Sequence, residues 1–411
     1  MHFRTFSSIL TFSSWQSIPR NCGLIFFIWL LASGCSGKND GIIGERLSDS
    51  TPLYNAYGIE SNRIFLVDTP TNRILNVNID SMTIENSFAL SKPKNKHTLA
   101  NSPSGSYVID FSTKHLEVIR ADGSREERPF DFQGTPVSAA YNPKKGILAM
   151  QDDLQSIGLL VLAENGKILQ SFLGGPLINK SKSLLAGDID SNGRLVLAVS
   201  DKSITIVDVE ASINASQWKS ESFDTDIADI KWLAPDSYKE NLSLVVATDS
   251  IAVVNLQTKS VTDKLPLSEN SLQVIGKSKL VKPHVVVVNS KIGLANIYYI
   301  GTDGKFETHE VSAPAPAAGM GEYTTSYLDQ TFTELSILYS RLDSHRIIKS
   351  RLSDNLVVLD KTVAAKGDAR LGPKSLFVNK KSQFGYLQAF ELKSEGVKEL
   401  KGFNFDLLRA K

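Results

Sequence analysis

A turn signal that recurs with a period in the mid-forties constrains this chain more than any other feature of its sequence. The turns are Asp80-Ser81, Asp122-Gly123, Asn165-Gly166, Ala211-Ser212, Thr258-Lys259, Asp303-Gly304, Asp354-Asn355 and Glu395-Gly396. They are separated by 42, 43, 46, 47, 45, 51 and 41 residues. Asp-Gly and Asn-Gly pairs favour tight hairpins because both central residues tolerate positive φ. Such a period indicates an array of similar units that bury one another.

Each unit consists of short apolar runs separated by turn residues. The clearest copy has two runs, Leu195–Val199 and Ile204–Val209, on either side of a polar turn at Ser200–Ser203. We find no amphipathic helix after about Tyr54, so the fold class is all-β. Four strands in each unit predict a β-propeller of eight four-stranded blades, with seven blades as the alternative.

The last unit, which starts at Ser375, lacks one recognisable strand. A propeller with an incomplete blade would expose unpaired backbone at its edge. We therefore expect Ile42–Leu47 or Phe403–Leu408 to supply the missing strand.

Two stretches carry a resemblance to known propellers. The sequences S-P-S-G-S-Y-V-I-D from Ser102 and D-S-N-G-R-L-V-L-A-V from Asp190 have the cadence of YVTN and WD-repeat blades. The pattern is similar over most of residues 54–402, whereas the Trp-Asp and Gly-His pairs of WD repeats are absent. The resemblance implies a propeller scaffold and leaves its function open.

The N-terminus has the features of an export signal. Nine apolar residues, Leu24–Ala32, are too few to span a bilayer and suit the central region of a signal peptide. The following Leu31-Ala32-Ser33-Gly34-Cys35 resembles the lipobox of bacterial lipoproteins. This resemblance implies a signal peptide over residues 1–34 and lipid, including palmitate, on Cys35. The alternative is an ordinary secretory signal with a chance cysteine.

The lipobox resemblance also implies a location. A lipidated Cys35 would anchor the protein in the bacterial cell envelope, and Ser36 in place of aspartate favours the outer membrane if the organism has one. Residues 35–50 are rich in Gly, Ser, Lys and Asp, which predicts a flexible tether. The propeller is then expected over residues 51–411.

Composition restricts the partners and cofactors. The chain has 45 basic and 44 acidic residues, so no global field attracts nucleic acid. Its two cysteines, Cys22 and Cys35, precede the body, which therefore contains neither a disulfide nor a thiolate metal site. We expect a monomer with a protein partner and no cofactor.

Asp188, Asp190 and Asn192 form the only motif that suggests a metal. They match the D-x-D-x-N-G opening of calcium loops. An EF-hand loop needs a carboxylate at its twelfth position, and Val199 stands there. The alternative is a plain hairpin turn.

Lysines recur in the loops between units and in the first turns of units. Six of them are predicted to share one face of the ring, namely Lys144, Lys145, Lys277, Lys279, Lys380 and Lys381. Such a face could bind an acidic partner. The alternative is that these lysines only keep the loops soluble.

Two functions remain at this point. The first is a lipid-anchored, non-catalytic propeller that binds protein partners or envelope components. The second is a propeller enzyme of the hydrolase or lactonase type, with histidines and carboxylates from several blades converging at the central channel.

Overall fold

We describe the protein from a computed structural model. The structure describes residues 43, 45–46, 53–54, 63–68, 73–78, 83–90, 96–102, 105–120, 122–177, 182–269, 271–278, 282–314, 323–329, 331–341, 343–372, 374–380 and 386–399. All of them belong to a compact unit that begins at Asp40. The predicted signal peptide and Cys35 lie outside the described residues.

Eight antiparallel sheets account for most of the described residues, and four consecutive strands form each one. We call these sheets blades 1 to 8. Blades 1 to 4 contain β2 (Leu53–Tyr54), β3 (Arg63–Asp68), β4 (Arg73–Asn78) and β5 (Thr83–Ala89); β6 (Lys96–Ser102), β7 (Gly105–Ser112), β8 (His115–Arg120) and β9 (Arg125–Pro129); β10 (Pro136–Asn142), β11 (Ile147–Asp152), β12 (Ile157–Leu162) and β13 (Ile168–Gly174); β14 (Leu184–Ile189), β15 (Arg194–Val199), β16 (Ser203–Asp208) and β17 (Ser220–Asp224).

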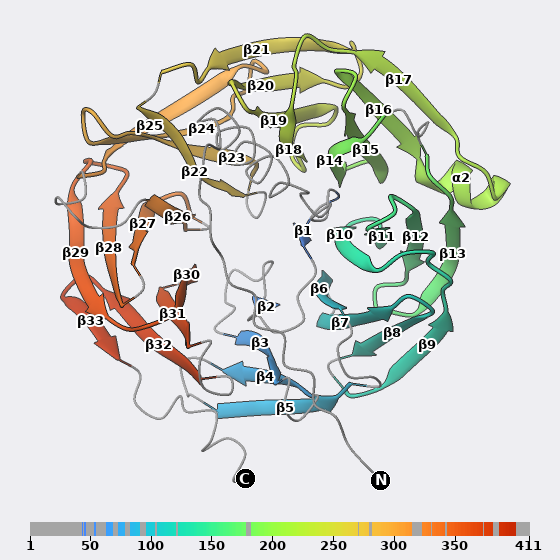
Figure 1. Cartoon of the computed structure of the whole chain (residues 1–411), viewed down its shortest axis with the longest axis horizontal. Coiled ribbons are helices and arrows are strands. Elements are labelled where there is room, and N and C mark those ends of the chain that lie inside the picture. Colours follow the sequence, from blue (N-terminus) through green and yellow to red (C-terminus); the bar gives the residue numbers. More distant parts are fainter. Residues whose placement is uncertain are drawn as a thin grey trace, which may run out of the picture. The chain divides into compact units, whose positions relative to one another are not determined.

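Blades 5 to 8 repeat the arrangement. They contain β18 (Ile230–Pro235), β19 (Leu242–Ala247), β20 (Ser250–Asn255) and β21 (Ser260–Pro266); β22 (Leu272–Ser278), β23 (His284–Asn289), β24 (Leu294–Ile300) and β25 (Phe306–Ser312); β26 (Tyr323–Leu328), β27 (Glu334–Ser340), β28 (Ser344–Arg351) and β29 (Val357–Ala364); β30 (Asp368–Gly372), β31 (Ser375–Lys380), β32 (Tyr386–Lys393) and β33 (Gly396–Glu399). The blades follow one another around a common axis, with the first strand of each innermost (Figure 1). This architecture is an eight-bladed β-propeller.

The apolar pattern explains why the sheets pack face to face. Middle strands such as β15 and β20 are buried along nearly their whole length, because both of their faces meet a neighbouring blade. The outermost strand β21 instead alternates between exposed and partly buried residues. Separate apolar clusters join blades 1 and 2, 2 and 3, 3 and 4, 4 and 5, 5 and 6, 6 and 7, and 7 and 8.

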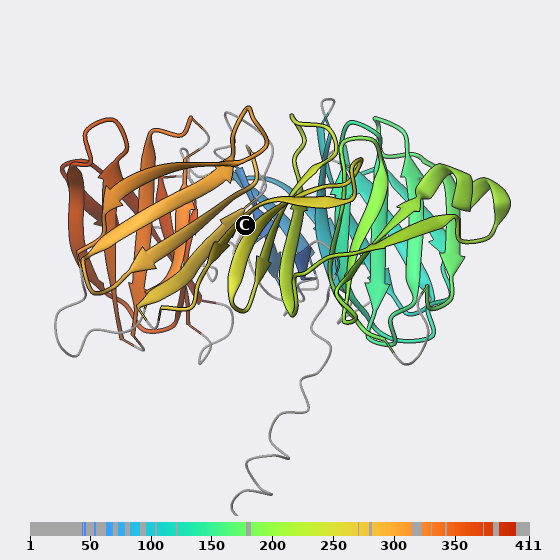
Figure 2. The same cartoon turned by 90° about the horizontal axis from the view of Figure 1, so that it is seen from above.

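Strand direction gives the ring two distinct faces. Because the strands of a blade are antiparallel, the turns after its first and third strands lie on one face, which we call the front face. The turns after the second and fourth strands lie on the back face. Figure 2 shows the blades from the side.

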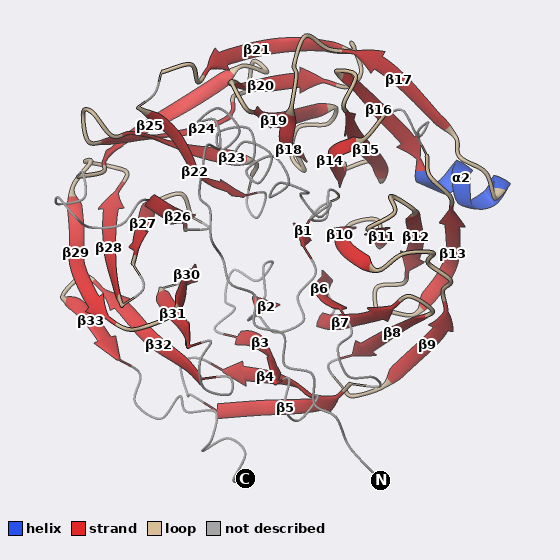
Figure 3. Cartoon of the chain, in the orientation of Figure 1, coloured by secondary structure: helices blue, strands red, loops and turns tan. Residues whose placement is uncertain are grey.

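Six of the predicted turns join the third and fourth strands of their blades, as expected. They are Asp122-Gly123, Asn165-Gly166, Thr258-Lys259, Asp303-Gly304, Asp354-Asn355 and Glu395-Gly396. The prediction was wrong at Ala211-Ser212, which lies inside the helix α2 (Val209–Ala215; Figure 3). Val209 and Ile213 are four residues apart and both buried, and the Asp208 carboxylate caps the helix by accepting the Ala211 N–H. Asp80-Ser81 lies outside the described residues.

The prediction for the last blade was also wrong. Blade 8 is complete in itself because β30 supplies its first strand, and β30 pairs with β31. Its five residues, D-A-R-L-G, hold only two apolar side chains at alternate positions, too short a pattern to stand out in the sequence. Phe403–Leu408 lies outside the described residues.

Part of the predicted tether belongs to the ring. The strand β1 (Glu45–Arg46) pairs with β10 as a fifth strand of blade 3, and Ile43 is fully buried. Among the described residues, no helix has the length and apolar character needed to cross a bilayer.

Candidate interaction surface

The loop between β18 and β19 lies on the front face. Its first residue, Asp236, is buried, and the Asp236 carboxylate accepts the backbone N–H groups of Tyr238 (2.8 Å) and Lys239 (3.1 Å). These hydrogen bonds fix the loop in a turn and leave Tyr238 70% exposed. A large aromatic ring is therefore held outward on a rigid support.

Lys144, in the first turn of blade 3, reaches this loop from two blades away. Its Nζ donates to the Ser237 carbonyl (3.1 Å) and lies 5.5 Å from the centre of the Tyr238 ring. Between them, Arg194 of blade 4 donates to the Asn241 side chain at 2.8 Å. The loop therefore lies against the front-face turns of blades 3 and 4.

A second cation lies against aromatic rings in the next blade. The Nζ of Lys282 is 3.5 Å from the centre of the Tyr299 ring and 4.6 Å from that of Phe332. Burial lowers the pKa of Lys282, and the Glu307 carboxylate opposes this effect. Its neighbour Lys239 donates to the Ile300 carbonyl at 2.6 Å.

These groups form one surface across blades 3, 5 and 6, which we call the basic–aromatic rim. Its residues are Lys144, Lys145, Tyr238, Lys239, Lys282 and Tyr299. Cations next to an exposed aromatic ring suit a partner that offers carboxylates beside apolar groups.

Of the six lysines predicted to share a face, the structure describes four, and it places one of them, Lys380, away from the other three. Lys144 and Lys145 are exposed on the front face, and Lys277 lies next to the end of β22 that meets this face. Lys380 ends β31, the second strand of its blade, and therefore lies toward the back face. That prediction was wrong because β30 went unrecognised, and a shift by one strand reverses the face of every following turn. Lys279 and Lys381 lie outside the described residues.

The calcium motif forms a hairpin turn. Asp190 Oδ1 accepts the N–H groups of Asn192 (3.0 Å) and Arg194 (2.8 Å), and its Oδ2 accepts the Arg194 guanidinium at 2.7 Å. Asp188 Oδ1 accepts the N–H of Ile189. Within the described part of the chain, no three His, Cys, Asp or Glu side chains are grouped to hold a metal.

A polar pocket of about 340 Å³ lies toward the back face of blade 4. It is lined by Lys182, Val199, Asp201, Ser203, Thr205, Ser222, Phe223 and Asp224. Its hydroxyls are already paired, since Thr205 and Ser222 are 2.8 Å apart and Ser203 donates to Asp201 at 2.6 Å. Lys182 and Asp201 form an ion pair at its edge.

Sequence reasoning missed most of the rim. Tyr238 and Lys239 went unnoticed because their partners Lys144 and Ile300 lie in other blades, and Lys282 because its partners Tyr299 and Phe332 are 17 and 50 residues along the chain. The only local signal was the loop's Asp236-Ser237, a typical turn pair that follows Pro235.

Comparisons with known proteins support the fold. No protein-family model and no curated protein matches the chain. Among solved structures, dihydro-heme d1 dehydrogenase NirN in complex with DHE is 12% identical, with a TM-score of 0.55, over 83% of this chain and 72% of that chain.

Two further solved structures are similar. The RRP9 WD40 repeats are 13% identical over 72% of this chain and 88% of that chain, with a TM-score of 0.46. The β-propeller domain of Myceliophteria thermophila Cps50 (Swd1) is 10% identical over 85% and 99%, with a TM-score of 0.47. The similarity to the NirN structure, at 12% identity, shows a shared fold alone.

Proposed function

We propose that this protein is a lipid-anchored, non-catalytic β-propeller of the bacterial cell envelope that binds an acidic partner protein through the basic–aromatic rim. The observation that carries the proposal is the exposed Tyr238 ring, held on a rigid loop with Lys144 beside it. Tyrosine is enriched at the centres of protein interfaces because it buries a large area at little conformational cost.

The surrounding lysines give the basic–aromatic rim its positive charge. Lys144 and Lys145 are exposed, so they attract carboxylates during the approach of a partner and raise the association rate. Lys282 is partly desolvated by Tyr299 and Phe332, and a carboxylate that reaches it would face little competing water. A partner with acidic side chains around an apolar residue matches this arrangement.

The membrane anchor in this proposal is supported by the lipobox-like Leu31–Cys35 alone. The several acyl chains of such a modification would hold the protein firmly to a membrane, most simply the outer membrane of a cell that has one.

Among the residues that the structure describes, we find no site that favours the enzyme alternative. His97 and Asp110 do form a His–carboxylate pair, with Nδ1 and Oδ1 3.0 Å apart. These side chains are only 2% and 1% exposed, so a substrate does not reach them.

Affinity capture from membranes in mild detergent tests the partner. We expect Lys144→Glu/Lys145→Glu and Tyr238→Ala each to lose most of a protein that the wild type retains. Lys291→Glu, on an exposed back-face turn, is the matched control and keeps it. Equal retention by all variants would exclude the rim as the binding surface.

The anchor is tested separately. Mass spectrometry of the N-terminal peptide is expected to show acyl chains on Cys35, and Cys35→Ser is expected to release the protein from the membrane fraction. An unmodified Cys35 in the mature protein would contradict the anchor and leave the rim experiment unaffected.

A further inference from the structure

Ile43 is buried inside the ring, although it precedes the first blade and belongs to none of the repeated four-stranded units. Its side chain is 0% exposed and packs in the apolar cluster between blades 3 and 4, with Ala140 of β10 and Leu195 of β15 among its members. A residue from before the first blade therefore completes a core formed by the third and fourth blades.

Two buried side chains receive the backbone of this residue. The Ile43 N–H lies 3.2 Å from Ser138 Oγ and 3.2 Å from Gln151 Oε1, and both accept it. Ser138 and Gln151 are themselves almost fully buried. A buried amide that is not paired is costly, so this pair of acceptors makes it possible for an extended backbone to enter the core.

The shape of the site also suits an extended segment. Ile43 forms a parallel bridge with Gly187 of β14, where a Cβ atom would lie 3.4 Å from Ile43 Cγ1 and 2.5 Å from Leu197 Cδ2. Glycine at this position therefore avoids a clash with Leu197, which packs in the same cluster as Ile43. The next residues pair antiparallel with the inner edge of blade 3, Glu45 with Ala139 and Arg46 with Ser138.

We propose that Ser138, Gln151 and Gly187 form a binding site for an extended peptide with one buried aliphatic side chain. The chain fills this site in cis with its own segment Ile43–Arg46, which we call the strap. The strap adds a strand to an otherwise open inner edge, the mode of recognition known as β-augmentation. This inference goes beyond the proposed function and does not depend on it.

The strap also limits the reach of any anchor. Only seven residues lie between Cys35 and Ile43, so the two are eight positions apart. A fully extended chain of that length spans at most about 28 Å. If Cys35 is lipidated, as proposed above, the lipid is therefore attached to the ring by a short stretch of chain that begins at the strap on blades 3 and 4.

Limited proteolysis of the full mature chain tests the strap. Trypsin cleaves after Arg46, which the strap pairs with Ser138. We expect Ile43→Asp to accelerate cleavage of the Arg46–Leu47 bond by at least about tenfold, because a charge in the core releases the segment. Ile292→Asp is the matched control, since Ile292 is 61% exposed on a back-face turn, and it leaves the cleavage rate unchanged.

Binding in trans tests the site itself. A fluorescent peptide of residues 40–48 is expected to bind the Ile43→Asp protein and not the wild type, whose own strap fills the site. The same peptide with Ile43→Asp does not bind. Adding Ser138→Ala to the Ile43→Asp protein is expected to weaken binding of the wild-type peptide about fivefold, the effect of one lost hydrogen bond.

Folding is checked by circular dichroism, and Ile43→Ala replaces Ile43→Asp if the latter does not fold. The inference is overturned if the folded variant protects the Arg46–Leu47 bond as the wild type does. It is equally overturned if the folded variant fails to bind the peptide, or if the wild type binds it equally well.

Discussion

The surroundings of His284 determine its tautomer and its protonation state. It begins β23, and its ring packs edge-on against Phe332, with the ring centres 5.6 Å apart. Its Nδ1 lies 3.0 Å from the Lys282 carbonyl, which can only accept, so Nδ1 carries the proton. Burial lowers the pKa of His284 to about 4, and the Lys282 ammonium acts in the same direction. The imidazole is therefore neutral in the folded protein at pH 7.

This pKa predicts a stability that depends on pH. The unfolded state binds the proton with a pKa of 6.5 and the folded state with a pKa of about 4. The contribution of the neutral ring is complete above pH 6.5 and is lost as the pH falls from there toward 4. Urea unfolding is expected to show that His284→Gln loses less stability between pH 7 and pH 4 than the wild type does, by about 3 kcal/mol. Equal losses in the two proteins would contradict the buried, neutral histidine.

Gly158 shows the opposite case, in which the absence of a side chain is required. It lies in β12 under the rings of Phe130 and Phe132, and a Cβ atom would come within 2.3 Å of Phe130 Cε1. Both rings are buried between blades 2 and 3. The position therefore has no room for even a methyl group.

Gly158→Ala is therefore expected to lower the free energy of unfolding by about 1 to 3 kcal/mol through overpacking. The matched control is Gly175→Ala, because nothing lies within 4 Å of a Cβ atom there. Thermal unfolding of both variants measures the difference. A Gly158→Ala protein as stable as the control would show that the two rings move aside without cost.

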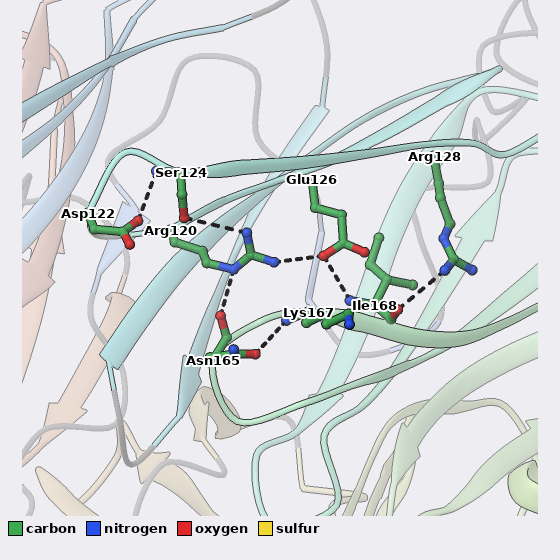
Figure 4. A network of polar contacts seen from close by, with 8 residues as sticks. All are labelled: Arg120, Asp122, Ser124, Glu126, Arg128, Asn165, Lys167 and Ile168. Atoms are coloured by element: carbon green, nitrogen blue, oxygen red, sulfur yellow. Dashed lines mark hydrogen bonds and ion pairs between the residues drawn. The ribbon is translucent and has the colours of Figure 1, made fainter.

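At the scale of the element, polar side chains connect the outer strands of blades 2 and 3 (Figure 4). Glu126 of β9 accepts the Arg120 guanidinium at 2.7 Å and the backbone N–H of Ile168 in β13 at 3.2 Å. Arg120 also donates to the Asn165 carbonyl at 2.7 Å. These polar contacts join the outer strands of the two blades beside the apolar cluster that also contains Ile168.

Glu126→Ala is expected to destabilise the protein by about 1 to 2 kcal/mol, because it leaves the Ile168 N–H and the Arg120 guanidinium without this acceptor. Glu126→Gln keeps a carbonyl oxygen and is expected to lose less than half as much. Chemical denaturation at low and high salt separates the charge from the hydrogen bonds. Identical losses for the two variants would mean that only the charge matters.

At the scale of the whole molecule, stacking between blades holds the ring together. Each described sheet is formed by consecutive strands, and the strap β1 is the exception that adds to a distant blade. Middle strands are covered on both faces, whereas outer strands such as β21 are covered on one. Protection from solvent therefore increases from the outer strands of each blade toward its middle strands.

Hydrogen exchange measured by mass spectrometry is expected to follow this order. Peptides from β15 and β20 exchange slowest, and those from the outer strands β17 and β21 at least about tenfold faster. Uniform exchange across each blade would indicate that blades open as single units.

Much of the fold could be predicted because its signals are local. The mid-forties period, the apolar runs and turns such as Asn165-Gly166 each depend on residues close in the sequence. The helix that contains Ala211-Ser212 and the strand β30 were not predicted, because a seven-residue helix and a five-residue strand offer too few positions for a period. Because β30 was not recognised in the sequence, Lys380 was predicted on the wrong face of the ring.

Periodicity in the sequence was enough to predict strands arranged in repeated units around an axis, with eight or seven blades, and the structure shows eight. Only the tertiary structure decided which side chains meet. Lys144 contacts a carbonyl 93 residues away, and Ile43 enters a core whose acceptors lie 95 and 108 residues along the chain. The physical reason is that periodicity fixes which face of a strand is buried, whereas contacts between blades depend on how the blades pack around the axis, which brings distant residues together.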